Sequence, residues 1–183
     1  MKKKKILITG ANGLLGRYLV EVLSQKYNVF AIVKNKKKLQ FKLNKNISVL
    51  QMDLSKINLN ILPSKVYAIY YLAQSNQYKK FPKGVNDMIS INVHAPIILA
   101  KWAMENKVKK FIYASSGGVY GDSKYPLKEF SQVHPNENLG FYINSKISAE
   151  ILLKNYLNKF MSIIIIRPFF MYGLGQKKDR LFP

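Results

Sequence analysis

The chain has 183 residues, of which 48% are hydrophobic, and this suits one globular domain with a sizeable core. It has no cysteine and two histidines, which excludes disulfides and a thiolate metal site and indicates no metal. The net charge of +21 comes mostly from lysine, since Arg17, Arg167 and Arg180 are the arginines, whereas nucleic-acid recognition favours the arginine fork. We therefore expect no nucleic-acid partner.

The first residues, Met1 to Lys5, are basic like the start of a signal peptide, but the apolar run after them is short and ends at Gly10. No stretch approaches the roughly 20 apolar residues that span a bilayer. We therefore expect a cytoplasmic protein with no membrane partner.

The N-terminal part alternates short apolar runs with a helical pattern. Strands are predicted over Lys5 to Thr9, Val29 to Val33 and Ser48 to Gln51, and a helix over Leu14 to Gln25. The lysine-rich segment from Lys34 to Asn46 predicts a short helix and a loop.

The middle of the chain begins with a fourth strand over Ala68 to Leu72, followed by a polar loop from Gln74 to Asn86. A loop at the carboxyl end of a parallel strand lines the ligand crevice in open sheets. A helix is predicted over Ile89 to Asn106, and Pro96 inside it predicts a kink or a helix that begins there.

The last elements are strands over Lys110 to Ala114 and Ser162 to Ile166, with the longest helix, Tyr142 to Phe160, between them. This alternation predicts the α/β class with a Rossmann-type, doubly wound parallel sheet. Residues 1–183 are expected to form one such domain.

Three glycines follow the first strand. Gly10, Gly13 and Gly16 lie between an apolar run and a helical pattern in ITGANGLLGRYLV. A strand, a glycine turn and a helix N-terminus together predict a site for the phosphates of a dinucleotide.

A second motif, FYINSKISAE, sets Tyr142 four residues before Lys146, so the two side chains share a helix face. A phenol with its ordinary pKa of about 10 needs a nearby cation to favour its charged form, and Lys146 is a candidate. Upstream, Ser115 and Ser116 follow a predicted strand and offer a hydroxyl that could polarise a substrate oxygen.

Together these motifs resemble the extended short-chain dehydrogenase/reductase family, most closely its sugar-nucleotide epimerase and dehydratase branch. The resemblance includes the three glycines, Ser116 in SSGGVYG, Tyr142 with Lys146, and RPFFMYGLGQ from Arg167 to Gln176, and it covers nearly the whole chain. It implies NAD or NADP as cofactor, hydride transfer and a nucleotide-sugar substrate.

The resemblance implies that cofactor contacts come from the glycine turn, the ends of the next strands, the catalytic helix and the last motif. These residues are Gly10, Gly13, Leu14, Leu15, Gly16, Arg17, Lys34, Asp53, Leu54, Leu72, Ala73, Gln74, Asn92, Tyr142, Lys146 and Phe169. For Asp53 a helix N-cap is an equal alternative.

Cofactor choice depends on the end of the second strand, where NAD enzymes of this kind usually have a carboxylate. Lys34 occupies that position. A lysine cannot accept a hydrogen bond from the ribose 2'-hydroxyl but suits a 2'-phosphate, and Arg17 could join it. We therefore expect NADP rather than NAD, with two surface cations as the alternative.

By resemblance, Tyr142 is the acid/base, Lys146 holds the ribose and lowers the phenol pKa, and Ser116 hydrogen-bonds the substrate oxygen, while Ser115 is structural. Dehydratases of the family carry an acidic pair where Gly117 and Gly118 stand. A 4-epimerase or a 4-keto-sugar reductase is therefore expected.

Two departures from the family pattern affect these expectations. Phe170 replaces a substrate-contacting asparagine, and family members continue well beyond the last motif with a substrate-binding lobe that is largely absent here. Weak or absent turnover by this chain alone is therefore expected, and the alternative is a non-catalytic NAD(P)-binding module or a fragment that acts with another chain. The family also implies a possible homodimer through a four-helix bundle.

Overall fold

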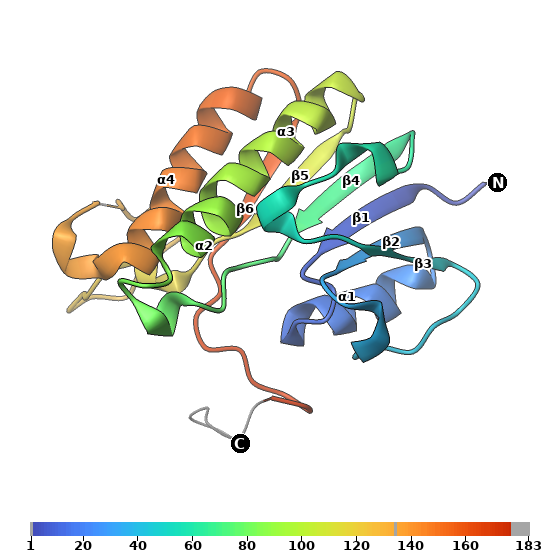
Figure 1. The fold of residues 1–183 in the computed structure, drawn as a ribbon. Coiled ribbons are helices and arrows are strands. Elements are labelled where there is room, and N and C mark those ends of the chain that lie inside the picture. Colours follow the sequence, from blue (N-terminus) through green and yellow to red (C-terminus); the bar gives the residue numbers. More distant parts are fainter. Residues whose placement is uncertain (1, 134, 177–183) are drawn as a thin grey trace.

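The computed structural model describes residues 2–133 and 135–176, and its centre is a six-stranded parallel sheet (Figure 1). The strands are β1 (Lys5–Thr9), β2 (Asn28–Val33), β3 (Ile47–Gln51), β4 (Val66–Tyr71), β5 (Lys110–Ala114) and β6 (Ser162–Ile166). The helices are α1 (Leu14–Ser24), α2 (Val85–Ile89), α3 (Ala95–Glu105) and α4 (Gly140–Leu157). The spatial order β3-β2-β1-β4-β5-β6 confirms the predicted Rossmann-type sheet.

Two apolar layers hold the helices on the sheet, because successive strand residues point to opposite faces. On one face Leu7, Ile69 and Phe111 pack in a cluster with residues of α3 and α4, such as Leu99 and Leu153. The other face, which includes Ile6, Ile8 and Val29, forms a cluster with Val20 of α1. Figure 1 shows α3 and α4 side by side, with α1 on the opposite side of the sheet.

The helix before β5 differs from the prediction. It already begins with α2 at Val85, inside the stretch predicted as a loop, and it continues into α3 through one wide π-helical turn, Ser90–His94. In that turn the N–H of Ala95 donates to the oxygen of Ser90, five residues earlier. Pro96 lies in the first turn of α3, which agrees with the predicted alternative of a helix that begins at this proline.

Pro96 and the buried tyrosines explain this wide turn. A proline has no N–H to donate to the carbonyl four residues before it, which here is Asn92. Tyr113 donates to that Asn92 oxygen at 3.1 Å, and Tyr71 donates to the neighbouring Ile91 oxygen at 2.6 Å. Backbone oxygens that a regular helix would use are therefore satisfied by side chains from β4 and β5.

Other element boundaries shift by a few residues. The fourth strand starts at Val66 and ends at Tyr71, and α4 covers Gly140–Leu157 instead of Tyr142 to Phe160. The lysine-rich segment contains only a short 3-10 turn, Lys36–Lys38. Within the described ranges, no helix is both long and apolar enough to cross a bilayer.

Candidate functional site

The glycine turn joins β1 to α1 in a conformation that excludes side chains. Gly10 has φ +65°, and a Cβ there would lie 2.8 Å from the backbone nitrogen of Ala73. A Cβ on Gly16 would overlap the oxygen of Gly10. Gly13 precedes α1, and no side chain caps this helix or places an acidic group in its first turn. An uncapped helix N-terminus beside a close backbone approach fits a dinucleotide phosphate.

Lys34 and Asp53 form an ion pair of 2.9 Å at the ends of β2 and β3. Their hydrogen bond lowers the pKa of Asp53 to about 2 and raises the pKa of Lys34. Asp53 also accepts from the Ser55 N–H at 3.0 Å and so caps the 3-10 turn that starts at Leu54. Asp53 is therefore a helix cap and a cation partner at once.

Arg17, the other expected cation, turns toward the C-terminal part of the described chain. Its guanidinium donates to the backbone oxygen of Leu174, which Tyr18 also contacts at 3.0 Å. Lys34 and Arg17 thus have different partners in this structure. Leu14 and Leu15, which begin α1, are half-buried.

The segment after β4 crosses the glycine turn. The backbone N–H groups of Leu72 and Ala73 both lie 3.2 Å from the Thr9 hydroxyl, to which they donate. Gln74 is exposed, and its Oε1 accepts a hydrogen bond of 2.7 Å from the phenol of Tyr142. The expected cofactor segment and the expected catalytic helix therefore meet directly.

Lys146 lies one helical turn after Tyr142 and is buried. Its Nζ donates to the backbone oxygen of Ala114 at 3.0 Å and lies 5.1 Å from the centre of the Tyr113 ring. Burial lowers the pKa of Lys146 to about 7, while the charge of Glu150 acts in the opposite direction. Because its pKa lies close to 7, this amine can gain or lose a proton near neutral pH.

The two serines after β5 have different surroundings. Ser116 begins the 3-10 turn Gly117–Tyr120, and its Oγ accepts from the Gly118 N–H at 3.2 Å. Ser115 is buried, and its Oγ has no hydrogen-bond partner among the described residues. Ser116 is thus the more accessible of the two hydroxyls.

Asn92, in the wide turn, makes contacts within the protein. Its Oδ1 accepts from the Ser75 N–H at 2.9 Å, and its Nδ2 donates to Ser145 Oγ at 3.0 Å. It therefore ties the segment after β4 to α4. Phe169, at the other end of the site, stacks on Tyr120 with ring centres 6.3 Å apart.

A largely buried ion pair that the sequence motifs did not predict lies beside the site. Arg167 contacts both carboxylate oxygens of Glu150, at 3.1 and 2.7 Å, and donates to the Tyr120 hydroxyl at 2.8 Å. Glu150 lies four residues after Lys146, on the same face of α4, and that spacing was a usable signal.

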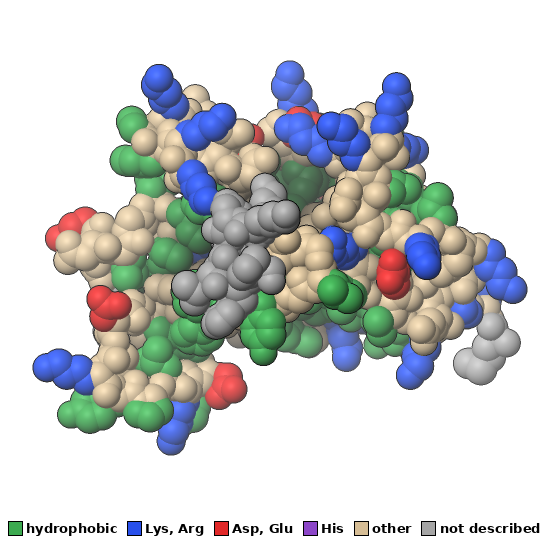
Figure 2. Space-filling model, turned by 90° about the horizontal axis from the view of Figure 1, so that it is seen from below, with side chains coloured by type: hydrophobic (Ala, Val, Ile, Leu, Met, Phe, Trp, Pro, Cys, Tyr) green, Lys and Arg blue, Asp and Glu red, His purple; other side chains and the backbone are tan. Residues whose placement is uncertain are grey.

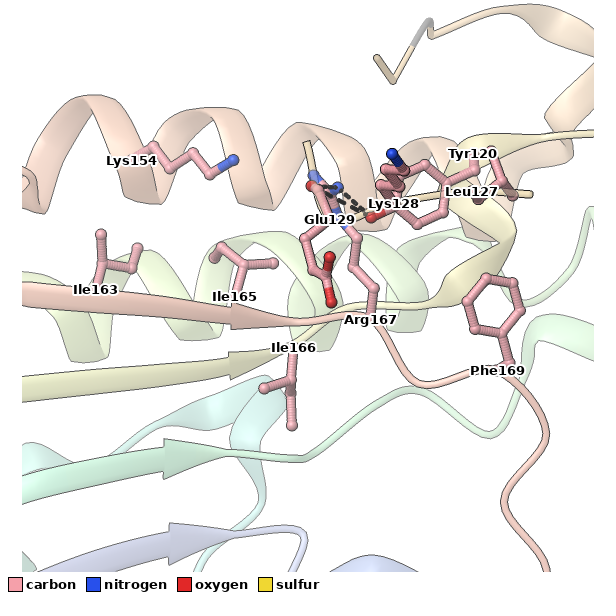
Figure 3. Close-up of a pocket in the computed structure, with 10 residues that line it drawn as sticks. All are labelled: Tyr120, Leu127, Lys128, Glu129, Lys154, Ile163, Ile165, Ile166, Arg167 and Phe169. Atoms are coloured by element: carbon pink, nitrogen blue, oxygen red, sulfur yellow. Dashed lines mark hydrogen bonds between the residues drawn. The ribbon is translucent and has the colours of Figure 1, made fainter. Parts of the chain in front are cut away.

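Hollows adjoin these residues. One of about 680 Å³ lies at the start of α4, beside Tyr142, Tyr78 and Phe81. Another, of about 520 Å³, follows the open side of β6 and is lined by Ile163, Ile165 and the Arg167 network (Figure 3). The first hollow is the one that the expected catalytic phenol reaches.

Charge on the surface is dispersed. Lys and Arg side chains are spread around the edge of the face in Figure 2, with hydrophobic side chains between them. The part of the chain that the structure describes holds no group of three His, Cys, Asp or Glu residues that could bind a metal ion.

Comparisons with known proteins agree with this geometry. The sequence profile of the NAD dependent epimerase/dehydratase family matches residues 6–183. Human dTDP-D-glucose 4,6-dehydratase is 26% identical over 98% of this chain and 55% of its own length, and Vibrio cholerae UDP-glucose 4-epimerase is 28% identical over 96% and 54%. The chain spans little more than half of these relatives.

Solved structures give the same result. UDP-glucuronic acid 4-epimerase from Bacillus cereus, in complex with NAD, superimposes with a TM-score of 0.82 at 26% identity. The match covers 96% of this chain and 59% of that one.

Proposed function

The chain belongs to the NAD-dependent epimerase/dehydratase family, and from this membership we propose that it acts on a nucleotide sugar as a 4-epimerase or a 4-keto-sugar reductase. The observation that carries the proposal is the hydrogen bond from Tyr142 to Gln74, in the segment after β4 that lies against the glycine turn. In this proposal residues 1–183 form one NAD(P)-binding Rossmann domain that holds the cofactor site and the catalytic residues.

The proposed roles follow from the chemistry of each group. The phenol of Tyr142 gives a proton to a sugar oxygen or takes one from it, and the Ser116 hydroxyl hydrogen-bonds the same oxygen. Lys146 holds the ribose of the cofactor and, in its protonated form below its pKa of about 7, favours the charged phenol. Hydride exchange is the chemistry that the cofactor supplies when bound.

The residues after Ser116 favour these reactions over dehydration. Elimination of water needs an acid and a base next to the sugar, and Gly117 and Gly118 provide neither. At Gly117 a Cβ would lie 2.6 Å from the ring of Phe169, so a longer side chain here would have to displace that exposed ring. Net loss of NADPH with a 4-keto sugar nucleotide supports reduction, and interconversion without net loss supports epimerisation.

NADP is the cofactor that Lys34 favours in this proposal. The Lys34 side chain is 72% exposed despite its bond to Asp53, so its ammonium remains accessible to a 2'-phosphate. Titration of the chain with NADPH and NADH, followed by nicotinamide fluorescence, tests both the site and the preference. Tighter binding of NADH contradicts the choice of NADP, and binding of neither cofactor contradicts the proposed function for this chain.

We also propose a homodimer in which α3 and α4 of each copy form a four-helix bundle. Ile98 of α3 is 40% exposed, and Ile151 and Leu152 of α4 are each 47% exposed. Exposed apolar side chains on neighbouring helices are typical of a subunit contact. Sedimentation analysis of the chain and of Leu152→Asp tests this: a dimer should become a monomer, and a wild-type monomer contradicts the proposal.

A further inference from the structure

Gln74 is a direct partner of the Tyr142 phenol, with 2.7 Å between the phenol oxygen and Oε1. We propose that Gln74 is a positioning residue that holds this phenol and serves its neutral and its charged form in turn. The acid/base part of this inference rests on the proposed function, since it takes Tyr142 to exchange a proton with a sugar oxygen.

The backbone on both sides of Gln74 is fixed. Ala73 is buried, and its N–H donates to Thr9 Oγ1. Ser75 is also buried, donates its N–H to Asn92 at 2.9 Å and its hydroxyl to Asp87, and accepts from the Gln77 N–H at 3.1 Å. The backbone at Gln74 is therefore already ordered, and only the rotamer freedom of its side chain is lost when it holds the phenol.

The phenol is held in the same frame. Asn92, which fixes Ser75, also donates to Ser145 Oγ at 3.0 Å, and that hydroxyl donates to the backbone oxygen of Tyr142 at 2.6 Å. The ring of Tyr78 adds a contact with the Tyr142 ring, with centres 5.2 Å apart. One buried amide thus links the backbone that carries Gln74 to the backbone that carries Tyr142.

A carboxamide suits this place because it offers both an acceptor and donors on one group. The neutral phenol donates to Oε1, as observed. A phenol has one proton to donate, so this O–H must first turn from Oε1 toward the sugar oxygen. A half-turn of the amide then presents Nε2–H, which donates to the phenol oxygen before the proton passes to the sugar oxygen and to the phenolate afterwards. The reverse transfer restores the first arrangement. A carboxylate at residue 74 would accept from the phenol but repel the phenolate.

The test is a titration of the chain labelled with ¹³C at the ζ carbon of tyrosine, followed by NMR. The Tyr142 signal is the one that Tyr142→Phe removes. In Gln74→Glu we expect the midpoint of this signal to rise by about one pH unit or more, because the carboxylate favours the neutral phenol. Gln74→Ala should change the chemical shift of the neutral form, because the acceptor is lost.

Asn76→Asp is the matched control, since it adds the same charge to the same segment at a side chain that bonds Gln77. It should move the midpoint far less than Gln74→Glu. Equal shifts in the two variants, or no shift in Gln74→Glu, would overturn the inference. The signals of the other tyrosines report whether each variant is folded.

This titration uses neither cofactor nor substrate, so it separates the two proposals. A shift in Gln74→Glu without turnover of any sugar nucleotide supports the positioning by Gln74 and counts against the proposed function. Turnover whose pH profile stays the same in Gln74→Glu counts against Gln74 alone.

Discussion

The Nζ of Lys146 lies inside the protein, 3.0 Å from the backbone oxygen of Ala114. Burial holds the pKa of this amine at about 7, far below that of a lysine in water, although Glu150 lies on the same helix face and favours the charged form. Folding therefore changes the proton affinity of this side chain, and the change can be measured through stability.

Stability should increase with pH above neutrality. Between about pH 7 and the ordinary lysine pKa of about 10.4, the unfolded chain binds a proton at Lys146 that the folded chain has released. The free energy of unfolding then rises by up to about 1.4 kcal/mol per pH unit from this group. Below pH 7 both states are protonated and the contribution is constant.

Urea unfolding at several pH values checks this, with Lys146→Met compared to wild type. The variant should lose this part of the slope, while Lys154→Met, at an exposed lysine of the same helix, should keep it. Equal slopes in wild type and Lys146→Met would show that the amine keeps its ordinary pKa. Wild type must be compared with the variant because other groups also change stability with pH. Burial raises the pKa of Tyr71 and of Tyr113, and this lowers the free energy of unfolding above about pH 10.

Removal of one hydroxyl tests the proposed acid/base. Tyr142→Phe should reduce turnover by at least about a hundredfold, the lower range for loss of a general acid or base, and leave cofactor affinity unchanged. Tyr78→Phe is the control, because its ring lies against Tyr142 but has no proposed proton to transfer. Unchanged turnover in Tyr142→Phe would remove Tyr142 from the mechanism.

Lys34 should discriminate between the cofactors. Lys34→Ala should weaken NADPH binding by about tenfold, the value of one charge-assisted contact, with little effect on NADH. Lys36→Ala, two residues later, should affect both cofactors equally and slightly. Lys34→Ala should also raise the pKa of Asp53 from about 2, which carboxyl NMR can follow without cofactor. An equal loss for NADPH and NADH in Lys34→Ala would assign Lys34 to general surface charge.

The ion pair between Glu150 and Arg167 should show strong coupling. The side chains are 4% and 14% exposed, so removing one partner leaves a charge with little solvent. Glu150→Ala should lower the free energy of unfolding by about 3 kcal/mol, whereas Glu150→Leu with Arg167→Met should cost less than the sum of the single changes. Urea unfolding of wild type, Glu150→Leu, Arg167→Met and the double variant gives the coupling, and additive effects would mean that the pair contributes no net interaction.

Much of the fold could be predicted because its signals are local. The apolar runs that became β1, β5 and β6 are short and bounded by polar or glycine residues, and the three glycines mark the turn to α1. The wide turn at Ser90–His94 could not be predicted, because it depends on hydroxyls of Tyr71 in β4 and Tyr113 in β5 that bind its backbone oxygens.

The site shows the same difference between local and distant signals. The four-residue spacing of Tyr142 and Lys146 is visible in the sequence, and the depth of Lys146 is not. The contact between Gln74 and Tyr142 joins residues 68 positions apart. Likewise, the partner of Lys34 is set by the register of β2 against β3, which places Val33 beside Gln51 and brings the ends of both strands together.

The wide turn at Ser90–His94 has a consequence for changes in chain length. Loss of one residue here would let a regular helix form, and everything before it would rotate by about 100° relative to α3. Asp87 would then face away from Ser75, and Met88 would leave the interior. A single-codon deletion in this helix should therefore do more harm than one in the exposed loop before β3, and gaps among homologous chains should avoid these five positions.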